Sequence, residues 1–182
     1  MRVSVLPAFA AVLIAVPSLA QPLPAAPPGP AEPLPRGYTA FGAPPVQGPS
    51  PGLSVKQFGN TYKVSFKAGD DIMGGMMRFA MAHRMQQAQL SGVGGVRKAL
   101  LAWYDPRARA FKQIPVNEKC EISGVTGTIT TDAQGKPNVH LHLVLSRQDG
   151  STVSGHLLSG TVDPVLEVFV TDLGAGKDVK VP

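Results

Sequence analysis

Three histidines lie close together in the sequence, and their types and spacing could support metal binding. His140 and His142 alternate with leucines in HLHLVLS, and His156 follows a predicted turn at Asp149-Gly150. Successive side chains of a strand point to opposite faces, so the first two histidines share one face and the leucines the other. Three neutral imidazoles that leave a fourth position open can hold Zn²⁺.

The length of the turn decides whether His156 joins the other two histidines. With a two-residue loop, His156 pairs with Leu143 and lies on the leucine face. With a three-residue loop, residues 148–150, His156 pairs with His142, and three imidazoles come within reach of one ion. A slip of one residue exchanges the two faces. The alternative to a metal site is therefore three separate surface histidines.

The surrounding sequence must supply the elements that position these side chains. Alternating patterns and turn residues predict strands at 61–67, 96–106, 111–116, 120–131, 138–146, 151–162 and 165–173. A helix is predicted from Ile72 to Ala88, capped by Asp70 or Asp71. The fold class is therefore α+β, a mostly antiparallel sheet of six to seven strands with one long helix packed on it.

Two glycine-rich stretches interrupt these patterns. Gly74 and Gly75 fall in the first turn of the predicted helix, where only close packing would favour them. Residues 91–95, SGVGG, follow the helix and precede a strand. A phosphate loop has the reverse order, because the N–H groups of the following helix bind the anion. We interpret SGVGG as a turn.

The N-terminal third of the chain differs in composition from the rest. Residues 1–20 resemble a secretory signal peptide with cleavage after Ala20, and their apolar run is too short to span a membrane. Residues 21–52 hold 11 of the 18 prolines and predict a disordered linker. Residues 53–182 form one domain. We expect an exported protein, periplasmic or secreted, without a membrane span.

Charge and cysteine content limit the kinds of partner and of covalent link that we expect for the domain. The domain has 15 Lys and Arg and 11 Asp and Glu, a net charge of +4 without a cluster of like charges. Such mild basicity favours acidic partners only weakly. The single cysteine, Cys120, excludes an intramolecular disulfide and is predicted to be a buried thiol on a strand. A metal thiolate or an intermolecular disulfide is the alternative.

Methionines at 73, 77, 81 and 85, with Met76 and His83 nearby, concentrate in the predicted helix. Thioethers favour Cu(I), so a soft-metal site is one interpretation. The preferred interpretation is that these side chains fill irregular space in the core.

The segment HLHLVLSRQDGSTVSGHLLSGTVDPVLEVFV resembles the core signature of the plants-and-prokaryotes (PPC) domain family. SGVGG, YDP and SGVTG also fall where that family has similar elements, and the resemblance covers about residues 55–175. Ser154 departs from it, since the family usually has glycine there. The resemblance implies a homotrimeric α+β domain with a metal site at His140, His142 and His156. The three-residue turn is therefore the predicted one.

Three functions remain open at this stage. The first is an exported trimeric binding module with a three-histidine metal, Zn²⁺ in the first place, and a possible small-molecule ligand. The second is an enzyme that uses metal-bound water, with Glu167 or Asp149 as the base. Glu167 could also orient a histidine or simply face solvent. The third is DNA binding, which export and the lack of an AT-hook or basic patch disfavour. Trp103 and Tyr104 lack the basic surroundings of a nucleic-acid platform.

Overall fold

The computed structural model describes residues 33–177, so the predicted signal peptide and the first part of the predicted linker lie outside the described residues. The elements in chain order are β1 (Tyr38–Ala40), β2 (Ser54–Phe58), β3 (Thr61–Lys67), α1 (Ile72–Ala82), β4 (Gln87–Asp105), β5 (Ala110–Val116), β6 (Cys120–Thr131), β7 (Pro137–Ser146) and β8 (Thr152–Asp172). Within the described part of the chain, no helix is long and apolar enough to cross a membrane.

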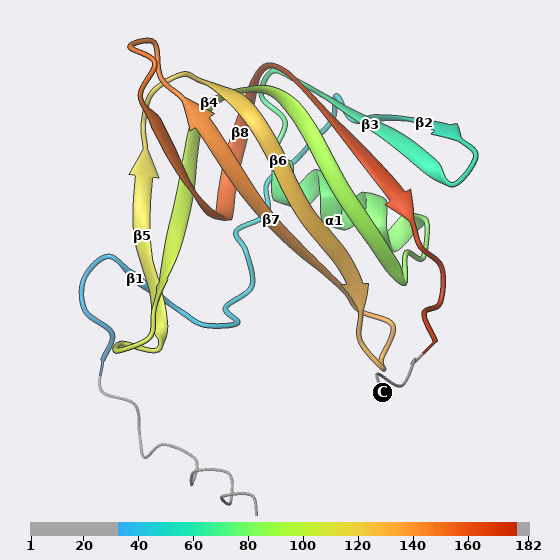
Figure 1. Cartoon of the computed structure of the whole chain (residues 1–182), viewed down its shortest axis with the longest axis horizontal. Coiled ribbons are helices and arrows are strands. Elements are labelled where there is room, and N and C mark those ends of the chain that lie inside the picture. The colour runs from blue at the N-terminus through green and yellow to red at the C-terminus, as the bar shows by residue number, and fades with distance from the viewer. Residues whose placement is uncertain (1–32, 178–182) are drawn as a thin grey trace, which may run out of the picture. The chain divides into compact units, whose positions relative to one another are not determined.

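The strands form one antiparallel sheet in the order β1-β5-β4-β6-β7-β8-β3-β2. The sheet curves back on itself because β4 and β8, the two longest strands, also pair with each other along most of their length. Figure 1 shows α1 lying across one face of this curved sheet, and the helix packs against β7 and β8. The predicted α+β class is confirmed.

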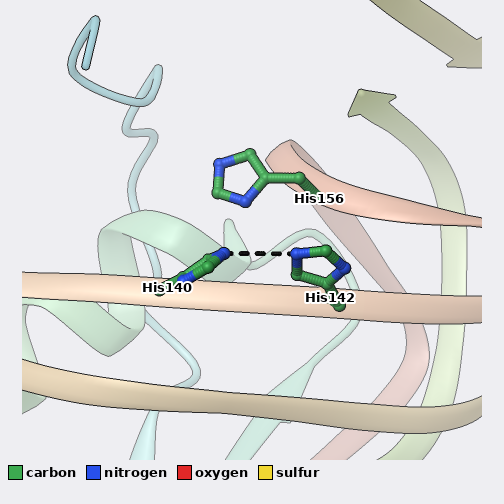
Figure 2. A group of neighbouring side chains, drawn as sticks. All are labelled: His140, His142 and His156. Carbon is green, nitrogen blue, oxygen red and sulfur yellow. Dashed lines mark hydrogen bonds between the residues drawn. The ribbon is translucent and has the colours of Figure 1, made fainter. Parts of the chain in front are cut away.

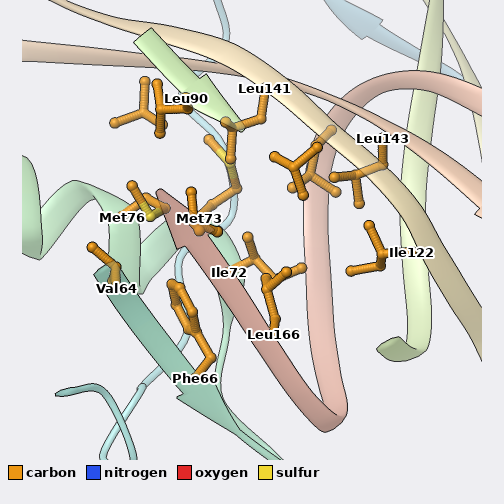
Figure 3. Packing of buried hydrophobic residues seen from close by; sticks show 14 of the residues in the cluster. Val64, Phe66, Ile72, Met73, Met76, Leu90, Ile122, Leu141, Leu143 and Leu166 are labelled. Atoms are coloured by element: carbon orange, nitrogen blue, oxygen red, sulfur yellow. The ribbon is translucent and has the colours of Figure 1, made fainter. Parts of the chain in front are cut away.

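The core lies between α1 and the inner face of the sheet. Leu141, Leu143 and Leu145 of β7 are completely buried, which confirms the predicted leucine face. Figure 3 shows two of these leucines pointing toward side chains from α1, among them Met73. Burial of each such side chain contributes about 1.5–3 kcal/mol. Their alternation fixes the opposite side of β7 as the outer, accessible face.

The prediction of six to seven strands is wrong in two respects: the two short strands β1 and β2 were not predicted, and the predicted strands 151–162 and 165–173 form the single strand β8. The sheet has eight strands, because β1 and β2 add to its two edges. β1 lies within the segment predicted to be a linker, and it pairs with β5. Nearby, the Ser50 hydroxyl donates to the Asp71 carbonyl, and buried Asp70 accepts from the Gly52 N–H. Parts of the predicted linker, β1 and residues 50 and 52, therefore contact the domain.

The prediction of a long helix is also wrong. The helix is capped by Asp71, as one of the two predicted alternatives, but ends at Ala82 instead of Ala88. Arg84 adopts a left-handed conformation with φ +50°, which turns the chain out of the helix. Beyond it, buried Ala88 and Leu90 alternate with exposed glutamines, a period of two that belongs to β4.

The glycines at 91–95 do not form the predicted turn but lie inside β4. A Cβ on Gly92 would lie 2.5 Å from the carbonyl oxygen of Glu167, and one on Gly94 would lie 2.6 Å from the Cα of Leu166. These glycines therefore allow β4 and β8 to approach closely. Gly74 and Gly75 serve the predicted close packing, since a Cβ on either would meet Gly48 or Phe66.

The methionines mostly fill the core, as the preferred interpretation holds. Met73, Met76 and Met85 are buried in the hydrophobic cluster, and Met77 packs against it. Met81 is 62% exposed, so the methionines do not share one face. Cys120 is a buried free thiol, as predicted.

Candidate metal centre

The turn between β7 and β8 has the three-residue form. The Arg147 N–H donates to the Ser151 carbonyl at 2.8 Å, and the Gly150 N–H donates to the Arg147 carbonyl at 3.0 Å. Gly150 has φ +81°, a conformation that glycine adopts at little cost. The Asp149 carboxylate accepts from the Ser151 N–H at 2.8 Å and stabilises the loop. The predicted loop, residues 148–150, is confirmed.

This turn places the three histidines together on the outer face of the sheet. His142 pairs directly with His156 across β7 and β8, and His140 lies two residues along on the same side. One ring nitrogen from each lies within 4.8 Å of the others. The Nε2 atoms of His140 and His142 are 3.2 Å apart. Figure 2 shows the three rings converging on one point.

His156 is the most enclosed of the three rings. The Phe111 ring stacks on it with centroids 4.8 Å apart and an interplanar angle of 9°. Its Nδ1 atom is buried and has no hydrogen-bond partner within residues 33–177. In Figure 2 this nitrogen points toward the other two histidines. A buried polar atom without a hydrogen-bond partner costs free energy, so we expect Nδ1 of His156 to bind a further group.

The electrostatics keep the ring of His156 neutral. Burial, together with the smaller effects of the neighbouring His140 and His142, lowers the pKa of His156 to about 4. Burial and His140 also lower the pKa of His142. Neutral imidazole is the form that binds metal ions, so little proton release has to accompany binding near pH 7.

The donor set fits a zinc ion. Zn²⁺ accepts imidazole nitrogens at about 2.0–2.1 Å in tetrahedral geometry, which puts two such nitrogens about 3.3 Å apart. The 3.2 Å between Nε2 of His140 and Nε2 of His142 is close to this spacing. Nδ1 of His156 would supply the third donor. The three side chains that would hold the ion are thus the three that the sequence indicates.

A pocket of about 610 Å³ opens beside the triad. Its lining includes an aromatic cluster of Phe41, Tyr104 and Phe111, which the sequence pattern did not predict. Tyr104 pairs with Phe111 across β4 and β5, and Ala102 of β4 pairs with His156 of β8. Of this cluster, only Tyr104, together with its neighbour Trp103, was singled out from the sequence. The positions of Phe41 and of the cluster beside His156 depend on the pairing of β1 with β5 and of β4 with β8.

Other residues weighed in the sequence do not join the triad. Glu167 forms an ion pair with Lys63 at 2.7 Å on the far half of β8, which makes it a solvent-facing residue rather than a histidine partner. Asp149 belongs to the turn. His83 packs against the rings of Tyr62 and Phe79 at the end of α1.

The fold and the triad define a single α+β domain whose outer sheet face carries a three-histidine cluster. A model of the Plants and Prokaryotes Conserved (PCC) domain matches residues 53–174. The chain therefore belongs to this family. The match confirms the family resemblance that the histidine segment carries.

Solved structures show the same fold. A Bacteroides thetaiotaomicron protein, named a putative DNA-binding protein, is 28% identical, with a TM-score of 0.65 over 68% of this chain and 86% of its own. A metal-containing protein of Archaeoglobus fulgidus is 27% identical, with a TM-score of 0.57 over 66% and 81%. A PPC protein of Pyrococcus horikoshii is 24% identical, with a TM-score of 0.61 over 69% and 84%. Comparison with curated proteins gave no match.

The lowered pKa of His156 predicts a dependence of stability on pH in metal-free protein. An unfolded histidine has a pKa of about 6.5, whereas that of His156 falls to about 4 on folding. Between these values the unfolded state binds more protons, so the free energy of unfolding decreases as the pH falls from about 6.5 to about 4. Urea unfolding with a chelator at several pH values measures this. His156→Gln should lose less stability over the same range, and equal pH profiles would contradict the assignment.

Proposed function

We propose that this protein is an exported metal-binding module in which His140, His142 and His156 hold one divalent ion, Zn²⁺ in the first place. The supporting observation is the convergence of three imidazole nitrogens within 4.8 Å of one another, beside a buried His156 Nδ1 that has no hydrogen-bond partner in the described part of the chain. The likeness to a protein named as metal-containing, at 27% identity, agrees with this proposal. The ion would supply positive charge and an open coordination position at the pocket.

Each histidine has a distinct part in this proposal. His142 and His140 come from one strand and approach the ion from the exposed side. His156 comes from the neighbouring strand and is held in place by the stacked ring of Phe111. Replacement of His156 would therefore remove both a metal-binding nitrogen and the least exposed side chain of the triad.

Metal content is the direct test. Protein purified without a histidine tag and dialysed should retain about one metal ion per chain, and His156→Ala should lower this to below about 0.1, because two imidazoles hold Zn²⁺ weakly. Elemental analysis by mass spectrometry measures both. The matched control is His83→Ala, which removes the remaining histidine. It packs against Phe79 outside the triad, so its loss should leave the metal content unchanged.

A wild-type protein that holds no more metal than His156→Ala, even after incubation with Zn²⁺, would refute the metal site. Loss of metal from His83→Ala to the same extent would show that the protein binds the ion elsewhere.

Export and trimer formation complete the proposal. Residues 1–20 have the pattern of a signal peptide, and the family resemblance implies a homotrimer. Protein recovered from the periplasm or medium of an expressing cell should start at Gln21, and its native mass should be three times that of the mature chain. N-terminal sequencing and native mass spectrometry test these points separately. A retained Met1 or a monomeric mass would each refute one of them.

DNA binding is the second candidate, favoured by the likeness to the Bacteroides protein. The described surface argues against it in part, because Lys63, Arg97, Lys119 and Arg147 already lie within 4.0 Å of a carboxylate. Electrostatic DNA binding weakens steeply with salt. Duplex binding that falls more than about tenfold between 50 and 200 mM salt would support this candidate, and its absence at the lower salt would exclude it.

A further inference from the structure

The wall of the pocket beside the triad is built from stacked aromatic rings. Phe111 stacks on His156, and Phe41 stacks on Phe111 with centroids 5.7 Å apart and an interplanar angle of 19°. Tyr104 meets both phenylalanines edge-on, at 5.5 and 5.7 Å. Phe41 is 69% exposed and Tyr104 is 41% exposed, so ring surface remains available on the pocket side of this cluster. Aromatic rings accept further rings in such stacked or edge-on contacts.

The other side of the pocket is formed by the β7–β8 hairpin. Val144 and Ser154 pair with each other next to the His142–His156 pair and face the same way. Thr126 of β6 pairs with His142 and lines the pocket next to the triad. Among residues 33–177, no aspartate, glutamate, lysine or arginine lines this pocket. Its volume of about 610 Å³ lies within the usual range for small-molecule sites.

Charge decides which small molecule suits this pocket. Three neutral imidazoles leave the full charge of a divalent ion uncompensated, and no lining carboxylate offsets it. An anionic oxygen on the ligand would therefore be favoured at the open coordination position. The rest of the ligand would meet apolar and aromatic side chains rather than a second charge. This combination describes a flat ring that bears one carboxylate.

We propose that the pocket binds a small planar aromatic carboxylate, with its carboxylate at the three-histidine metal and its ring against Phe41 and Tyr104. The proposal rests on the metal site proposed above. Phe41 comes from the proline-rich segment before the domain, which packs on the domain through β1 and the pairing with β5. That segment thus contributes a binding side chain instead of serving only as a spacer.

The experiment uses the full mature protein loaded with Zn²⁺, whose metal content is measured first. The probe is benzoate, followed by ligand-observed NMR. Two matched compounds serve as controls: cyclohexanecarboxylate keeps the charge but loses the flat ring, and benzyl alcohol keeps the ring but loses the charge. Benzoate should bind with a Kd of about 1 mM or tighter, and each control compound should bind at least about threefold more weakly.

Phe41→Ala tests the wall without touching a proposed metal ligand or the buried core. It should retain its zinc and weaken benzoate binding about threefold to tenfold, the range expected for one lost aromatic contact. Phe58→Ala is the matched control, since Phe58 is 60% exposed on β2 and does not line the pocket. It should leave both zinc content and benzoate binding unchanged.

The outcomes separate the two proposals. If the protein holds zinc and benzoate does not bind, or binds no better than cyclohexanecarboxylate, the ligand proposal is overturned and the metal site stands. If Phe41→Ala and Phe58→Ala bind benzoate equally well, the aromatic wall is overturned as the ring-binding surface. If Phe41→Ala dissociates a wild-type oligomer and neither protein binds benzoate, the cluster is a contact between copies of the chain, which also overturns the proposal. If no zinc is held, both proposals fail together.

Discussion

The register between β7 and β8 is the constraint on which the site depends. It is fixed at one end by the turn, where Gly150 takes a left-handed conformation and Asp149 accepts the Ser151 N–H. It is fixed along the strand by burial, because the leucines of β7 occupy the core. The three-residue form of the turn pairs His142 with His156. With β7 held by its leucines, a shift of β8 by one residue would pair His156 with Leu143 and turn it toward the core. The three-histidine cluster therefore depends on this register.

The sequence predicted the parts of the structure that depend on local patterns. Alternation and turn residues identified β3, the second half of β4, β5, β6, β7 and both halves of β8, and the Asp149-Gly150 signal placed the turn. The sequence left two possible partners for His156, Leu143 and His142. The family resemblance favoured His142, which is the observed partner. The failures share a physical cause. SGVGG has the composition of a turn, but its glycines are required by the approach of β4 to β8, which are distant in sequence. Likewise, β1 is only three residues long, too short for an alternating pattern, and is defined by its pairing with β5.

The aromatic wall beside the site illustrates the same limit. Phe41, Tyr104 and Phe111 lie in three segments whose local sequences give no reason to connect them. Two pairings join them: β5 with β4 places Phe111 beside Tyr104, and β1 with β5 brings Phe41 close to both. The pairing of β4 with β8 then sets this group next to His156. The last two steps are contacts between strands distant in sequence, so the pocket is a property of the sheet topology rather than of any motif.

Burial links the stability of the domain to the chemistry of the site. Packing against Phe111 excludes water from His156, and this loss of solvation lowers the pKa of the ring to about 4. The same packing leaves Nδ1 without a partner within the described residues, which costs free energy in the absence of a bound group. A site that was optimised only for stability would place an apolar side chain at this position. A neutral imidazole with an available nitrogen is instead suited to a metal ion, because binding of an ion would offset the cost of burying that nitrogen. The burial of His156 is thus the physical argument on which the proposed metal site depends most.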